Sequence, residues 1–231
     1  MVNLNSYIMN VCRCFREMRD EYIENVERVE KQRVLNEKRA EILKVIYQFL
    51  SDTDPSPLRY EFPVDLFVAR DRALAKVRKW HEEKRTELVE AAIDVAAHRP
   101  KDVQLYMDAE EWCDCVTEIV GEWARLNPEL WAEEAGPLLE DETKRHAILS
   151  LIYWSGSAAT HFKPWLMPFV ENPSLLSKDE KISLVDAIGD GGADENVMPL
   201  LLQLERRVYG EEVKEEINIY KRAIECHKSK V

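Results

Sequence analysis

The chain has 231 residues, a formal net charge of −12 and a sequence pI near 5.0. A hydrophobic fraction of 45% is enough for a packed core, and so acidic a chain would repel the phosphates of nucleic acid, so disorder and direct nucleic-acid binding are both disfavoured. Its 7 glycines and 10 prolines favour long helices over a sandwich or barrel, and the sequence has neither a signal peptide nor an apolar run of membrane-spanning length. We therefore expect an all-α protein of the cytoplasm.

The first part of the chain predicts one long helix from about Ser6 to Leu50, with Asn36 as a candidate break. Apolar residues recur there at spacings of three and four, as they do along one face of a helix. We expect these residues to form a single buried stripe: Phe15, Met18, Tyr22, Val26, Val29, Ile42, Leu43, Ile46 and Phe49.

A proline-containing segment from about Ser51 to Pro63 predicts the first loop, because proline lacks an amide donor and disfavours helix in the residue before it. A second long helix is expected from about Val64 to His98, ending before Pro100. Together the two helices predict an antiparallel hairpin, a first unit of residues 1–104. The expected core residues of the second helix are Leu66, Phe67, Leu74, Val77, Leu88 and Ile93.

Residues 105–231 predict a second unit built from shorter helical hairpins, and the alternative is that both units form one continuous body. The segments 151–170 and 187–204 align, because in each an apolar helix ends at small or glycine residues before a proline. We expect that proline, Pro164 or Pro199, to open the second helix of the hairpin, where its missing amide donor has no cost. Copies of this unit, with a period of roughly 30–36 residues, begin near Glu110, Asp141, Ser177 and Gly210.

The segment 187–201, Ala-Ile-Gly-Asp-Gly-Gly-Ala-Asp-Glu-Asn-Val-Met-Pro-Leu-Leu, resembles the HEAT repeat family, in particular its short bacterial form with a small-residue turn and a proline-led second helix. The resemblance is good over residues 177–204, fair over 141–170 and poor before Glu110. It implies an α-solenoid that displays a curved binding surface, and it implies no reaction.

The most acidic part of the chain is residues 108–142, where twelve carboxylates stand against Arg125 alone and account for −11 of the net charge. At about 100° per residue, four carboxylates of its first helix fall within an arc of roughly 80°, opposite the apolar side chains. This acidic ridge is either a docking strip for a basic partner or a solvated helix face. The acidic residues assigned to partner binding are Glu111, Asp114, Glu118, Glu122, Glu133, Glu134, Glu140 and Asp141.

An aromatic cluster, Trp154, His161 and Trp165, falls at one repeat turn. Tryptophan is enriched among the residues that dominate binding energy at interfaces, so we assign these three to partner binding as well. The alternative is that the tryptophans fill space between hairpins.

No metal or cofactor is expected. Glu118 and Glu122 have the spacing seen in di-iron bundles, but such sites also need a Glu-x-x-His motif, which this sequence lacks. The two Cys-x-Cys pairs would splay on helices, because residues two apart point about 200° away from each other. We therefore expect all five thiols to stay free: Cys12, Cys14, Cys113, Cys115 and Cys226.

These features favour a non-catalytic protein-binding module whose partner is a protein with a basic surface, with no membrane contact. The leading hypothesis is an acidic inhibitor or immunity-type protein that neutralises a basic toxin such as a nuclease. The alternative is a scaffold or assembly adaptor that forms a homo-oligomer through the N-terminal hairpin. A third class, DNA-repair or pigment-lyase enzymes with HEAT-like folds, fits less well because the DNA enzymes need a basic cleft.

Overall fold

The computed structural model describes residues 4–53, 66–103, 107–156, 159–189, 197–208 and 210–228, with the side chains of residues 4–17, 53, 66, 67, 224 and 226–228 outside that description. All regular structure within these ranges is helical, which confirms the predicted all-α class. The elements in chain order are α1 (Leu4–Thr53), α2 (Leu66–Glu82), the 3-10 helix η1 (Thr86–Leu88), α3 (Val89–Ala97), α4 (Ala109–Leu126), α5 (Pro128–Ala135), η3 (Gly136–Glu140), α6 (Glu142–Ser155), α7 (Ala159–Glu171), η4 (Pro173–Leu175), α8 (Lys178–Gly189), α9 (Met198–Glu205) and α10 (Glu211–Lys228).

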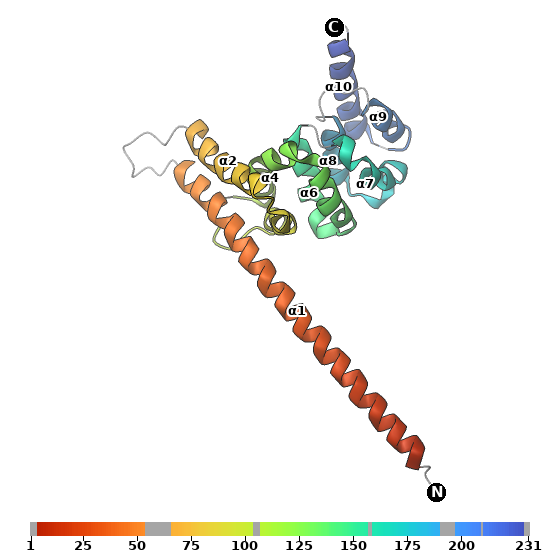
Figure 1. The fold of residues 1–231 in the computed structure, drawn as a ribbon. Coiled ribbons are helices and arrows are strands. Elements are labelled where there is room, and N and C mark those ends of the chain that lie inside the picture. Colours follow the sequence, from red (N-terminus) through yellow and green to blue (C-terminus); the bar gives the residue numbers. More distant parts are fainter. Residues whose placement is uncertain are drawn as a thin grey trace.

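The helices from α4 onward form a solenoid-like stack of two layers (Figure 1). Helices α4, α6, α8 and α10 pack side by side as one layer, and α5, α7 and α9 form the other. Each pair begins within one residue of a predicted repeat start, because local caps fix these starts. Asp108 accepts from the amides of Glu110 and Glu111 before α4, and Asp141 accepts from the amide of Thr143 before α6.

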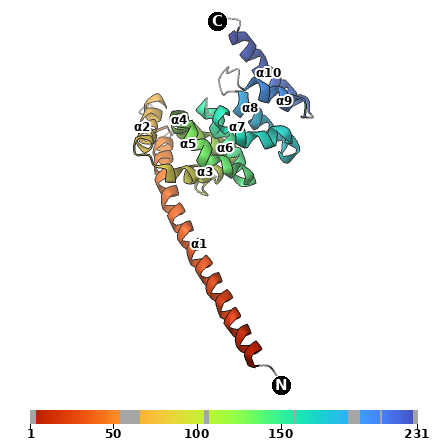
Figure 2. The same ribbon diagram turned by 45° about the vertical axis from the view of Figure 1, so that its right-hand side comes forward.

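The N-terminal half of α1 projects from the body as an arm (Figures 1 and 2). Helix α1 runs without a break through Asn36, and its 50 residues span about 75 Å at 1.5 Å per residue. Among its described side chains, those packed on the body lie in its C-terminal half, where Ile42, Ile46 and Phe49 are buried and α1 contacts α2 and α3. Of the loop expected at residues 51–63, the first three residues complete α1, and the rest lies outside the described residues.

The predicted single stripe along α1 is wrong, because the helix carries two apolar stripes on different faces. Met18, Tyr22, Val26 and Val29 are 50–70% exposed, whereas Ile42 is fully buried. At about 100° per residue, the buried stripe lies roughly 150° around the helix from the exposed one. Apolar residues do recur at intervals of three and four along α1. The intervals alone do not show that the apolar face moves around the helix between residue 29 and residue 35.

The predicted helix 64–98 is also wrong as one element. Helix α2 ends at Glu82, Lys84 adopts a left-handed backbone conformation with φ 53°, and the chain restarts as η1 and α3. Such a conformation is uncommon for lysine and is maintained by its surroundings. The next residue, Arg85, binds Glu41 of α1 at 2.9 Å, which holds the turn against the first helix. Of the expected core residues whose side chains are described, all are buried: Leu74, Val77, Leu88 and Ile93.

The two prolines that were expected to open helices behave differently. Pro199 lies in the first turn of α9, as predicted. Pro164 lies inside α7, which begins five residues earlier at Ala159 and also contains Pro168. The second helix of that hairpin is therefore longer than its proline predicted.

A continuous hydrophobic core runs from Ile42 in α1 to Ile217 in α10. It passes without interruption across the predicted unit boundary at residue 104, because α3 packs against both α4 and α6. The arm lies outside this core.

Candidate protein-interaction surfaces

The acidic ridge of α4 begins in a helix cap. Asp108 and Glu111 form a capping box, in which the Asp108 carboxylate accepts from the Glu111 amide at 2.9 Å and the Glu111 carboxylate accepts from the Asp108 amide at 2.8 Å. Glu111 is exposed, but its carboxylate already satisfies an otherwise unpaired donor at the helix start.

The middle of the ridge faces α2 rather than solvent. Glu118 lies 3.2 Å from Arg70, and Glu122 lies 3.1 Å from Arg78 and 2.9 Å from Arg125. The Glu122 side chain is only 13% exposed. Hydrogen bonds from Arg125 and Arg78 hold the pKa of Glu122 below its usual range. These carboxylates therefore connect α4 to the basic face of α2.

Asp114 belongs to a polar network between α4 and α6. Its carboxylate accepts from Ser150 Oγ at 2.8 Å and from Trp154 Nε1 at 3.5 Å, and Ser150 Oγ lies 2.8 Å from the buried Thr117 hydroxyl. The predicted arc of carboxylates was geometrically right, with Trp112 and the other apolar side chains buried on the opposite side. The ridge is occupied by contacts within the chain along most of its length.

The remaining assigned carboxylates lie on the surface. Glu133 and Glu134 are exposed near the end of α5, and Glu140 and Asp141 are exposed where η3 meets α6. Asp141 accepts from the Thr143 hydroxyl at 2.7 Å, and this bond lowers the pKa of Asp141. Among the assigned carboxylates outside the cap of α4, the exposed ones therefore lie on the α5–α6 connection rather than on the ridge.

The aromatic residues are divided between packing and surface. Trp165 is half-buried, and its ring lies so close to Gly136 that a Cβ there would be 2.3 Å from Trp165 Cδ1. Trp154 is 37% exposed and packs its backbone and Cβ against Gly121, while its indole reaches Asp114. His161 is exposed. Trp165 thus fills space between hairpins, and Trp154 and His161 are accessible.

Sequence reasoning missed an acidic groove of about 650 Å³ between α3, α4, α6 and α8. Glu110, Glu142 and Asp179 line it, and no lysine or arginine does so among the described residues. Its one imidazole, His146, lies 3.3 Å from Ser183 Oγ. The sequence alone does not group these acidic residues, because they lie in the first turns of three different helices.

A second groove, of about 850 Å³, lies between α1 and α2. Lys44, Lys76 and Lys79 line it together with Trp80. Its Glu41 is already bonded to Trp80 Nε1 at 3.0 Å, as well as to the Arg85 guanidinium. The groove therefore has a basic balance in an acidic protein, and its Glu41 contacts also hold α1 to the body.

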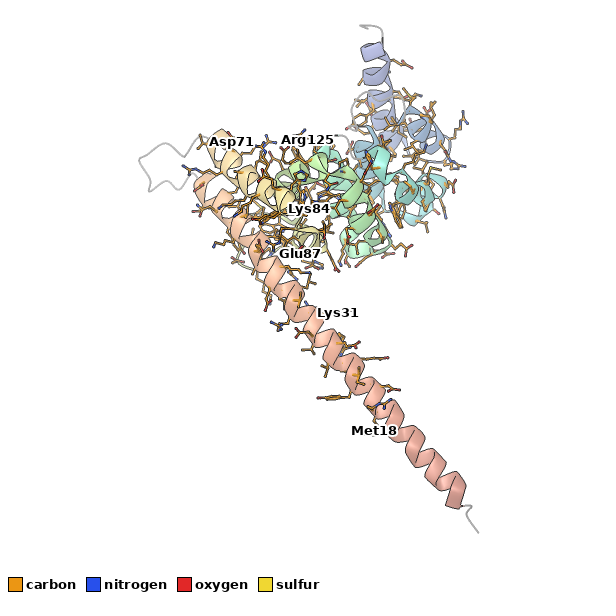
Figure 3. The ribbon with its side chains drawn as sticks, in the orientation of Figure 1. Met18, Lys31, Asp71, Lys84, Glu87 and Arg125 are labelled. Atoms are coloured by element: carbon orange, nitrogen blue, oxygen red, sulfur yellow. The ribbon has the colours of Figure 1, made fainter. Side chains whose placement is uncertain are left out.

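The arm carries an exposed apolar stripe whose residues were expected to be buried. Its members Met18, Tyr22, Val26 and Val29 are 59%, 70%, 50% and 66% exposed, and Ile23 beside them is 45% exposed. Figure 3 shows Met18 on the outer part of the arm and Lys31 nearer the body. Single exposed apolar residues are ordinary, but a contiguous row of this kind is typical of interaction surfaces, so the stripe is a candidate for one.

Cys113 and Cys115 are free thiols, and burial raises the pKa of each to about 12. No cluster of three or more potential metal ligands occurs among the residues described, and none of their helices is long and apolar enough to cross a membrane. The chain matches no protein-family model, no curated protein and no solved structure.

Proposed function

We propose that this chain is a non-catalytic, protein-binding adaptor in an assembly, with the helical stack as its body and the arm as a contact surface for another protein chain. The observation that carries the proposal is the uncovered apolar stripe of α1. It lies on a helix whose other end is anchored in the core, so whatever the arm holds is joined to the body.

The solvent exposure of the stripe supports this role. An isolated helical segment is marginally stable in water, and most helical stability in proteins comes from packing of an apolar face. The arm has local support from Arg33, which binds Glu30 and Glu37 at 2.6 Å each. Such exposed pairs add only about 0.3–0.5 kcal/mol each, so a protein contact along the stripe is the larger source of stability.

A photo-crosslinking experiment tests the proposal. A benzophenone amino acid at Tyr22, in the stripe, should form protein adducts in the cell. The same amino acid at Lys31, about 180° around the helix from Tyr22, should form far fewer. Equal adducts at both positions, or none at Tyr22, would contradict an adaptor role for the arm.

The acidic inhibitor remains a second candidate, favoured by the exposed carboxylates of the α5–α6 connection and by the acidic groove. In this reading a basic toxin in the cytoplasm docks on the body. Binding of a partner recovered by pull-down should weaken with salt and on reversal of Glu133 and Glu134 to lysine. Unchanged binding of every recovered partner would reject it. Glu118 and Glu122 are poor positions for this test, because reversing them breaks contacts with α2.

A further inference from the structure

We infer that the stripe on the arm is one half of an antiparallel two-helix coiled coil, and that its occupant is the same stripe of a second copy of this chain. The inference rests on the proposed adaptor role and adds the identity of the chain that the arm binds. Four observations carry it: the spacing of the stripe, its position on α1, its area and the distribution of charge along the arm.

The spacing is that of a coiled-coil seam with one stutter, because two intervals of four follow each other between Met18 and Val26. Met18, Tyr22, Val26 and Val29 follow one another at intervals of four, four and three. Toward the N-terminus the sequence continues the pattern at alternating intervals of four and three. At about 100° per residue, all eight positions fall within an arc of about 80°, which is narrower than the face of a helix that packs on a globular core. The four additional positions are Leu4, Ile8, Val11 and Phe15.

Six of the eight seam positions align with one another when a second copy is reversed, and the other two, Ile8 and Val26, meet with an offset of one residue, about 1.5 Å. If residue 4 lies beside residue 29 of the second copy, then residue 11 lies beside residue 22 and residue 15 beside residue 18. Each of these layers contains two apolar residues, one from each copy, as an antiparallel coiled coil requires. A seam of 26 residues is about 39 Å long, and the two copies overlap along all of it.

The body leaves the described stripe residues exposed, and at the near end of the stripe Glu87 and Glu90 of the body line a groove together with Val26. The buried contacts of α1 begin near Leu35 and use the other face of the helix, through Ile42 and Ile46. The seam ends at Val29, so the residues of a reversed second copy that pair with the seam lie before the packed part of α1. The two bodies then lie at opposite ends of the paired arms, as the free projection of the arm in Figures 1 and 2 allows.

The apolar surface that two paired seams would remove from water is large enough for a stable dimer. Full burial of one apolar side chain of this size removes about 60–120 Å² from water, so eight from each copy remove roughly 1,000–1,900 Å². Specific protein interfaces bury about 1,600 Å² in total.

Charge along the arm favours the antiparallel orientation. Residues 4–19 carry three arginines and one glutamate, a net charge of +2, whereas residues 20–30 carry five acidic residues and one arginine, a net charge of −4. A reversed copy places Arg13 level with Asp20 and Arg16 level with Glu17. In a parallel pair, each basic or acidic stretch would instead lie beside a stretch of the same charge and repel it.

Molar mass tests whether the occupant is a second copy. Purified full chain, followed by sedimentation equilibrium, should have twice the chain mass of 27.0 kDa. Tyr22→Glu should reduce the mass to that of one chain, and the matched control Lys31→Glu, a charge change on the opposite face, should leave the dimer intact. Both variants should keep the thermal unfolding of the body, because the two side chains are exposed. A single-chain mass throughout the concentration range, or a Tyr22→Glu variant that stays dimeric, would overturn the inference.

Disulfide trapping tests the orientation, in a chain with Cys12, Cys14 and Cys226 replaced by serine. Val29→Cys alone should not cross-link, because residues 29 of the two copies are about 37 Å apart when the helices are reversed. A mixture of Leu4→Cys and Val29→Cys chains should form the mixed disulfide. Efficient Val29–Val29 cross-linking would instead show a parallel pair and refute the antiparallel arrangement.

The two proposals fail in different ways. If the purified chain is monomeric and Tyr22 adducts contain a different protein, the second copy is wrong and the adaptor role stands. If Tyr22 forms no adduct with any chain and the purified protein is monomeric, both are wrong.

Discussion

Removing the Glu122 carboxylate should destabilise the fold by disconnecting α4 from α2. The change to make is Glu122→Gln, which keeps the shape of the side chain and removes its charge. Four contacts are affected: Nε and Nη2 of Arg78 lie 3.2 and 3.1 Å from Oε1, Nε of Arg125 lies 2.9 Å from Oε2, and Nη2 of Arg125 lies 3.0 Å from Oε1.

The expected magnitude follows from burial. Hydrogen bonds to charged groups contribute about 1.5–3 kcal/mol, and the Glu122 side chain is 13% exposed. Arg78 and Arg125 are 50% and 52% exposed, so solvent screening brings the expectation to the lower end, about 1.5 kcal/mol. For a chain of this length, such a loss lowers Tm by about 3–6 °C.

Thermal unfolding at several pH values is the assay. The folded-state pKa of Glu122 is lowered, so its contribution is fully present above the unfolded pKa of about 4.3 and is lost as pH falls through the lower folded value. The difference in Tm between wild type and Glu122→Gln should therefore be full at pH 7 and shrink below about pH 4. The control is Glu133→Gln, an exposed carboxylate in the same acidic segment, which should change stability by less than about 0.5 kcal/mol. Equal Tm values for wild type and Glu122→Gln at pH 7 would refute the assignment of Glu122 to the α2–α4 contact.

Three further substitutions or measurements test the body. Gly136→Ala should cost about 1–3 kcal/mol in denaturant unfolding, because the new Cβ would lie 2.3 Å from the Trp165 ring; unchanged stability would mean that the ring is free to move. Arg145→Ala should cost about 3–5 kcal/mol, because it leaves the Glu180 carboxylate, now 3.0 Å from Arg145, without its cation in a partly buried site. A loss under 1 kcal/mol would show that water replaces the guanidinium. The Cys113 thiol, whose pKa burial raises to about 12, should resist a thiol reagent at pH 8 until the chain unfolds, and rapid labelling of the native protein would contradict its burial.

Features set by neighbouring residues were predictable from the sequence. The starts of α4 and α6 follow from Asp108 and Asp141, whose side chains bond to amides two or three residues ahead. The arc of carboxylates on α4 follows from the helical repeat alone. These features need no knowledge of the rest of the fold.

Features set by distant residues were not predictable in the same way. The basic partners of the ridge, Arg70 and Arg78, lie more than 40 residues before Glu118 and Glu122, so a ridge read by itself looks free. The left-handed Lys84 precedes Arg85, whose partner Glu41 lies on α1, more than 40 residues earlier in the chain. The exposed stripe of α1 has the same spacing as a buried one, and only the position of the body distinguishes them.

Because α1 is one uninterrupted rod, its two apolar faces have a fixed rotational phase. The short spacer between Val29 and Leu35 sets that phase. Each residue inserted there would turn the body about 100° around the arm axis and move it about 1.5 Å along it, whereas seven residues would nearly restore its direction. The spacer length therefore fixes the direction of the acidic groove when a partner binds the arm. An insertion in the spacer would change that direction without changing the stripe or the groove.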